Sequence, residues 1–114
     1  MISRRIRPRT NLDAEVSVPG SKSCTARALI MAALTRGVSR LTGLAQGDDA
    51  GYMLEGLRTL GAEIDRDGDD VTVTVRRLAA PDSPLYLGNS GTAMRFLTAA
   101  SASIPGTIVL DGNA

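Results

Sequence analysis

The 114-residue sequence lacks histidine and tryptophan and has a single cysteine, Cys24. Without histidine, the chain has no histidine general base and none of the common zinc sites. One cysteine forms no internal disulfide, which is typical of a reducing, cytosolic setting. With one Phe and two Tyr, the core must be built from Leu, Ile, Val, Ala and Met, as in helices packed closely on a sheet.

Charge and hydropathy exclude two further kinds of partner. Thirteen basic residues oppose twelve acidic ones, and a net charge of +1 gives no reason to expect nucleic acid. The longest apolar run, 28–34, is too short to span a membrane, and no apolar signal segment follows the N-terminus. We therefore expect a cytoplasmic, domain-sized chain with no nucleic-acid or membrane partner.

The residue pattern predicts an α/β (α+β) fold. Period-two alternation over 12–18 predicts a half-buried strand. The apolar stretch 23–36 predicts a buried helix that ends at Gly37. The other expected elements are a strand at 38–44, a helix over 50–60 whose turn and N-cap come from 47–49, and hairpin strands at 62–66 and 71–76. Together they form a βαβαββ unit over residues 12–77.

The pattern starts again after a loop that contains Pro81 and Pro84. A strand at 85–87, a turn at 88–92, a helix over 93–103 and a strand at 107–110 are expected. Residues 85–114 therefore look like an incomplete second unit. Because a half-built unit exposes surfaces that its partners would cover, we expect the chain to be marginally stable or aggregation-prone. Residues 1–10, with four arginines, are expected to be a solvated tail.

The first strand-to-helix turn carries anion-binding chemistry. Pro19-Gly20 ends the strand, and Lys22 and Ser23 open the helix, with Arg27 one helical turn after Ser23. A helix start offers free N–H groups and a positive dipole end. The segment lacks the first glycine of a nucleotide P-loop. On this short motif alone, a tight turn with a Ser cap explains the residues equally well.

The second strand-to-helix turn strengthens the anion-binding interpretation. Gly91 lets a ligand approach the backbone, and Asn89, Ser90 and Thr92 offer capping side chains. Arg95 follows Gly91 by about one helical turn. Two such turns in one short chain indicate a shared anion site.

Three neighbouring residues have ordinary structural explanations. Asp48 and Asp49 at a helix start are more typical of capping groups than of an acid–base pair. An ion pair with one of them is at least as well supported for Arg95 as direct ligand contact. Without a neighbouring base, Cys24 is expected to be a small helix-packing residue.

The two turns, with Asp48-Asp49 and Leu60-Gly61-Ala62 between them, resemble the N-terminal part of the 5-enolpyruvylshikimate-3-phosphate synthase (3-phosphoshikimate 1-carboxyvinyltransferase) family. The resemblance runs from about residue 12 to residue 112, with both long motifs in the family's order. The sister enolpyruvyl transferase that acts on a UDP-sugar has an asparagine-containing segment in place of Lys22-Ser23. The resemblance implies the inside-out α/β fold of repeated βαβαββ units.

The resemblance also implies a reaction. The enolpyruvyl group of phosphoenolpyruvate is transferred to the 5-hydroxyl of shikimate 3-phosphate, and phosphate is released, in the shikimate pathway of aromatic amino acid biosynthesis. The family needs no metal or organic cofactor. Its full-length members are usually monomeric, and glyphosate inhibits them in competition with phosphoenolpyruvate.

Site residues follow from the same resemblance. Lys22 is the expected catalytic residue and contacts both substrates. Ser23 and Arg27 are expected to hold shikimate 3-phosphate, and the backbone of Gly91 is expected to meet phosphoenolpyruvate. Possible supporting residues are Asn89, Ser90, Thr92, Arg95 and Asp49.

The sequence also departs from the family pattern. Phe96 stands where many members have proline, and Ala26 where many have asparagine, so the pocket or its glyphosate sensitivity is expected to differ. An arginine-containing segment for phosphoenolpyruvate and a second domain with acid and base residues would follow residue 112. The 114 residues alone are therefore expected not to catalyse the reaction. A stand-alone phosphate- or carboxylate-binding module is the alternative, and a purely structural α/β domain is a third.

Overall fold

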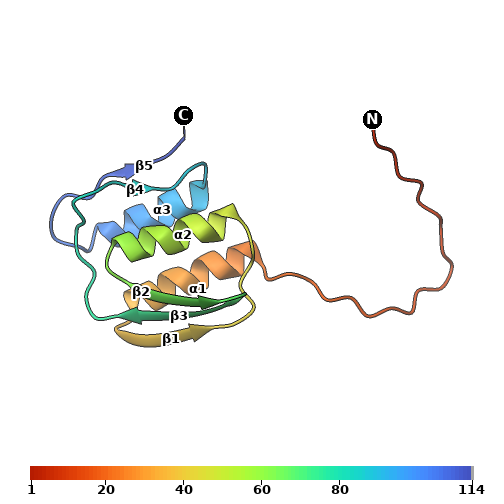
Figure 1. The fold of residues 1–114 in the computed structure, drawn as a ribbon, viewed down its shortest axis with the longest axis horizontal. Coiled ribbons are helices and arrows are strands. Elements are labelled where there is room, and N and C mark those ends of the chain that lie inside the picture. Colours follow the sequence, from red (N-terminus) through yellow and green to blue (C-terminus); the bar gives the residue numbers. More distant parts are fainter. Residues whose placement is uncertain (114) are drawn as a thin grey trace.

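The computed structural model describes residues 1–113, which contain both helices and strands. The helices are α1 (Lys22–Leu34), α2 (Asp48–Thr59) and α3 (Gly91–Ser101). The strands are β1 (Gly37–Leu41), β2 (Glu63–Asp67), β3 (Asp70–Val75), β4 (Leu85–Tyr86) and β5 (Leu110–Asp111). Figure 1 shows the three helices side by side, with one small sheet on each side of their layer.

The larger sheet is antiparallel with strand order β1-β3-β2. Its hairpin pairs Asp67 with Asp70 across the expected turn, so the hairpin prediction is confirmed. In the smaller sheet β4 and β5 run parallel, with Leu85 opposite Leu110. That register places the last strand at Leu110–Asp111 rather than at 107–110, because β5 forms only where β4 offers hydrogen-bonding partners.

The core lies between the helices and on the inner face of the larger sheet. Leu29 of α1, Leu57 of α2 and Leu97 of α3 are each 0% exposed, as is Val73 of β3. Burial of each such side chain contributes about 1.5–3 kcal/mol. The apolar stripe expected along α2 is confirmed, since all of its members are buried: Ala50, Met53, Leu54, Leu57 and Leu60.

Helix α1 is buried on one face only, so the expectation of an all-round buried helix is wrong. One face packs against β1, β3, α2 and α3. The opposite face leaves Met31 62% and Leu34 59% exposed, and Cys24 is exposed as well. Cys24 is therefore not a packing residue. An apolar composition all round does not show which face finds a neighbour.

Residues 12–18 form no strand, which corrects the prediction for this stretch. Leu12, Val16 and Val18 are 86%, 76% and 81% exposed. Period-two alternation becomes a strand only where a neighbouring edge accepts its backbone hydrogen bonds, and no strand among residues 1–113 pairs with it. Figure 1 shows this stretch and residues 1–10 extending away from the helices as one arm.

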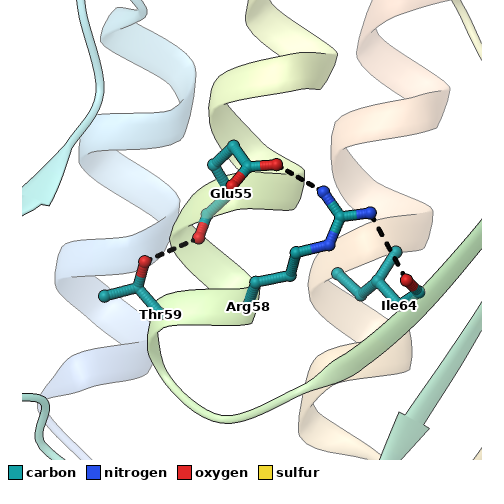
Figure 2. Close-up of polar contacts among 4 residues, drawn as sticks. All are labelled: Glu55, Arg58, Thr59 and Ile64. Atoms are coloured by element: carbon teal, nitrogen blue, oxygen red, sulfur yellow. Dashed lines mark hydrogen bonds and ion pairs between the residues drawn. The ribbon is translucent and has the colours of Figure 1, made fainter.

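Helix α2 is tied to the strand that follows it. The guanidinium of Arg58 donates to Glu55, one helical turn earlier, and to the carbonyl oxygen of Ile64 in β2 at 3.3 Å (Figure 2). The Thr59 hydroxyl donates to the Glu55 carbonyl oxygen at 2.9 Å. These contacts fix the last turn of α2 against β2. They thereby help to set the direction of the whole helix, including its first turn at Asp48 and Asp49.

Candidate functional site

The first turns of α1, α2 and α3 meet at one end of the helical layer (Figure 1). Between them lies a pocket of about 240 Å³. Its walls are Lys22, Ser23, Thr25 and Ala26 of α1, Ala45, Gln46 and Gly47 of the β1–α2 loop, Asp49, Ala50 and Met53 of α2, and Ser90, Thr92 and Ala93 at the start of α3. Three helix starts direct three positive dipole ends and their free N–H groups toward one space, which attracts anions.

The first turn is held against the loop before α2. A Cβ at Gly20 would overlap the Gly43 carbonyl oxygen and would lie 2.7 Å from the Ala45 nitrogen, so only glycine fits there. In the first turn of α1, the buried Thr25 hydroxyl accepts a hydrogen bond from the Ala45 N–H at 2.9 Å. Lys22 and Ser23 therefore sit on a helix start that is fixed on both sides.

The second turn is buried more deeply. Gly88 has a φ of +53°, and a Cβ there would overlap the ring of Tyr52. Ser90 is only 3% exposed and accepts a hydrogen bond from the Ala93 N–H at 3.2 Å, which caps α3. The Asn113 N–H donates to the Gly88 carbonyl oxygen at 2.8 Å. This turn forms a rigid wall of the pocket.

Among the pocket-lining residues, Lys22 is the cation and Asp49 the anion, and they pair. Lys22 Nζ lies 2.6 Å from Asp49 Oδ2, with side chains 64% and 35% exposed. The hydrogen bond from Lys22, and then one from the Ser90 hydroxyl, lower the pKa of the Asp49 carboxyl below its ordinary value. Because the two charges cancel, the helix dipoles and free N–H groups supply the remaining positive potential. A small anion is the ligand that this arrangement suits.

The structure brings five of the nine expected site residues into the pocket wall: Lys22, Ser23, Asp49, Ser90 and Thr92. The other four, Arg27, Asn89, Gly91 and Arg95, are exposed and lie outside the lining.

The Arg95 guanidinium lies beside Gly91, since a Cβ on Gly91 would be 3.5 Å from Arg95 Nη1. Within residues 1–113, Arg95 forms no ion pair with Asp48 or Asp49. The expected capping by these aspartates is also absent, because Gly47 is the N-cap of α2 and no side chain bonds there.

The sequence analysis did not identify two of the polar residues in the pocket, Thr25 and Gln46. The two positions where the sequence departs from the family pattern, Ala26 and Phe96, lie in different environments. Thr25 faces the loop and Gln46 lines the wall; a polar residue on the apolar side of a helix is the signal that points to Thr25, and nothing in the pattern singles out Gln46. Ala26 is 9% exposed and lines the pocket, as a residue that shapes it should. Phe96 packs on the core instead.

Two other kinds of site find no support in the part of the chain that the structure describes. Among residues 1–113, no group of three or more His, Cys, Asp and Glu side chains is placed to hold a metal ion. In the same residues, no helix has the length and apolar character that crossing a membrane requires.

Comparison with known proteins assigns a family. A family model described as EPSP synthase (3-phosphoshikimate 1-carboxyvinyltransferase) matches residues 6–114. A 3-phosphoshikimate 1-carboxyvinyltransferase from Rhizobium leguminosarum bv. trifolii is 50% identical over 111 residues, which are 95% of this chain and 26% of that protein. One from Pseudomonas savastanoi pv. phaseolicola is 48% identical over 104 residues, 90% of this chain and 25% of that protein.

A solved structure agrees with the sequence matches. EPSP synthase from Acinetobacter baumannii superposes with a TM-score of 0.79 at 35% identity, over 87% of this chain and 23% of that one. The α/β fold implied by the resemblance is therefore confirmed for the part present. The chain spans about a quarter of the length of the curated relatives it matches. With a family model that covers nearly all of it, the chain belongs to the EPSP synthase (3-phosphoshikimate 1-carboxyvinyltransferase) family.

Proposed function

We propose that this chain forms one wall of the active site of an enzyme that transfers the enolpyruvyl group of phosphoenolpyruvate to the 5-hydroxyl of shikimate 3-phosphate. The observation that carries the proposal is the convergence of three helix starts and Lys22 on one pocket. Both substrates carry phosphate and carboxylate groups, and fixed N–H donors and cations stabilise the charge that moves during such a reaction. The family assignment supports the same substrates.

The proposed roles follow the position of each residue. Lys22 lines the pocket and supplies the ammonium that contacts both substrates, and Ser23 beside it donates a hydroxyl to shikimate 3-phosphate. Arg27 is exposed one turn along α1 and reaches the same ligand from outside the lining. Gly91 offers its backbone N–H at the start of α3 to phosphoenolpyruvate. Thr92 lines the pocket, whereas Asn89 and Arg95 support it from its rim.

The remaining parts of the proposal concern the whole enzyme. Glyphosate is an inhibitor that competes with phosphoenolpyruvate, the location is cytoplasmic, and the full-length protein is a monomer. Residues 12–77 and 85–114 are one full and one partial copy of a repeated unit. Further acid and base groups for catalysis are expected from a second domain of the enzyme.

Titration calorimetry with shikimate 3-phosphate tests the proposal. The unchanged chain should bind saturably, and Lys22→Ala should weaken binding at least tenfold, because a hydrogen bond to a charged group contributes about 1.5–3 kcal/mol. Arg5→Ala in the exposed arm is the matched control and should bind like the unchanged chain. Absence of binding by the unchanged chain, or equal affinity for Lys22→Ala, would contradict the proposed role of this pocket.

A second candidate is an anion-binding module without catalysis. It is favoured by one observation, namely that anion-binding groups of Lys22 and Ser23 lie beside three helix starts in this pocket. Phosphate release after addition of phosphoenolpyruvate distinguishes the two functions. Binding of shikimate 3-phosphate without any phosphate release from this chain supports the module, whereas release above the uncatalysed rate excludes it.

A further inference from the structure

The hydroxyl of Thr25 makes a different kind of contact from those of three other threonines in or beside the helices. Each of those hydroxyls donates to the carbonyl oxygen four residues earlier in its own segment: Thr35, Thr59 and Thr98. Thr25 is 5% exposed, and its oxygen accepts the Ala45 N–H at 2.9 Å, a residue 20 positions away. The Thr25 hydroxyl therefore joins two elements, α1 and the loop before α2.

That loop is fixed independently to the hairpin of β2 and β3. The Leu44 N–H donates to the carbonyl oxygen of Asp69 in the hairpin turn at 2.8 Å. The Gln46 side-chain amide donates to the Gly68 carbonyl oxygen at 3.3 Å, and its oxygen accepts from the Arg66 guanidinium. The loop is thus a firm support against which Thr25 can hold the start of α1.

The same two segments also meet at the ion pair of the pocket. Lys22 Nζ lies 2.6 Å from Asp49 Oδ2, with side chains 64% and 35% exposed. Lys22 and Thr25 are three residues apart and share a face of α1, and Asp49 follows Ala45 by four residues. An exposed ion pair restrains its partners weakly, whereas a buried N–H is costly to leave unpaired. The Thr25 bond is therefore the stronger of the two neighbouring contacts.

We propose that Thr25 is a positioning residue whose buried hydroxyl ties the loop to α1 and so sets the spacing between the Lys22 ammonium and the Asp49 carboxylate. The tight packing at Gly20 limits how closely the first turn approaches the loop. A directional hydrogen bond in addition fixes how the helix is turned against the loop. The consequence for ligand binding rests on the proposed function, whereas the arrangement of the two charges does not.

NMR of the 114-residue chain tests the proposal without a ligand. Thr25→Val keeps a similar shape but removes the acceptor, so the Ala45 N–H should exchange with solvent about tenfold faster or more. The nuclear Overhauser contact between the Lys22 and Asp49 side chains should disappear. Thr25→Ser keeps the oxygen and should preserve both signals. Thr25→Ala removes the hydroxyl without placing a methyl group against the N–H, and it replaces Thr25→Val where that variant fails to fold.

Thr59→Val is the matched control, because it removes a hydroxyl that donates within its own helix at 2.9 Å. It should leave the Ala45 exchange and the contact between Lys22 and Asp49 unchanged. Calorimetry with shikimate 3-phosphate adds the functional readout: Thr25→Val should bind about fivefold more weakly or worse, whereas Thr25→Ser and Thr59→Val should bind like the unchanged chain.

A merely structural role for Thr25 gives a different result. If Thr25→Val lowers the melting temperature but keeps the contact between Lys22 and Asp49, the proposal is overturned. Unchanged exchange of the Ala45 N–H, or equal losses in Thr25→Ser or Thr59→Val, overturns it as well. A chain that binds no shikimate 3-phosphate but shows the expected NMR changes disproves the proposed function and leaves the role of Thr25 standing.

Discussion

The two glycine-serine turns have the same design but divide the work of the pocket between them. Each places a serine N-cap whose oxygen accepts the N–H three residues later, Ser21 from Cys24 at 3.3 Å and Ser90 from Ala93 at 3.2 Å. Ser21 is exposed, whereas Ser90 is buried. The exposed turn supplies the charge of Lys22, and the buried turn supplies a wall of the pocket.

Gly88→Ala should break the buried turn with the largest effect. Alanine at a φ of +53° costs about 1–2 kcal/mol, and its Cβ would overlap the Tyr52 ring, so we expect a loss of about 3 kcal/mol in the free energy of unfolding. Urea unfolding measures it. Gly51→Ala in α2, where a Cβ meets nothing within 4 Å, is the control and should stabilise by about 0.5–1 kcal/mol; equal effects would contradict the assignment.

Gly20→Ala should damage the exposed turn somewhat less. No strained φ is involved, but the Cβ would overlap backbone atoms of Gly43 and Ala45. Because the loop must shift, we expect a loss of about 2 kcal/mol in urea unfolding and displacement of Lys22 from Asp49. A loss below about 0.5 kcal/mol would mean that the first turn is not fixed by this loop.

Removing the two serine N-caps, Ser90 of α3 and Ser21 of α1, compares the buried turn with the exposed turn directly. Ser90→Ala should cost about 2 kcal/mol, since it removes the buried cap of α3 and leaves the Ala93 N–H without its partner. Ser21→Ala removes an exposed cap, which water replaces in part, and should cost about 0.5–1 kcal/mol. Thermal unfolding of both variants under one set of conditions measures the difference. Equal costs would show that burial does not distinguish the two turns.

The pH dependence of stability should show the smallest effect. The pKa of Asp49 in the folded chain lies below the ordinary value of 3.8, so its stabilising contribution is present above that value. It is lost as pH falls through the lowered pKa. Asp49→Asn should therefore lose less stability than the unchanged chain in urea midpoints measured between about pH 5 and pH 2.

Lys22→Met is the matched variant for this titration. It removes the first cause of the lowered pKa of Asp49 and should flatten the profile in the same pH range. A profile as steep as that of the unchanged chain in both variants would show that the pair does not contribute to acid sensitivity.

Local sequence signals predicted most of the elements correctly. The stripe of α2 and the hairpin of β2 and β3 depend on residue spacing and on turn residues within a few positions, so they are readable without the fold. The two glycine-serine turns were found in the same way, and five of the nine expected site residues line one pocket.

Long-range neighbours could not be read from the same signals. The alternation over 12–18 predicted a strand, but no edge among residues 1–113 pairs with it. The apolar composition of α1 predicted burial on all sides, yet only one face of the helix packs against other elements. The sequence left Arg95 open between a ligand contact and an ion pair with Asp48 or Asp49, and in the structure Asp49 pairs with Lys22 instead.

The sequence by itself determined that two helix starts rich in hydroxyl, glycine and cationic groups exist in this chain, because those properties depend on residues close together along the backbone. Only the tertiary structure decided that a third helix start joins them, that Asp49 pairs with Lys22, and that Ser90 is buried in the wall of the same pocket. These contacts join residues far apart in sequence, and packing of the three helices in parallel brings them together.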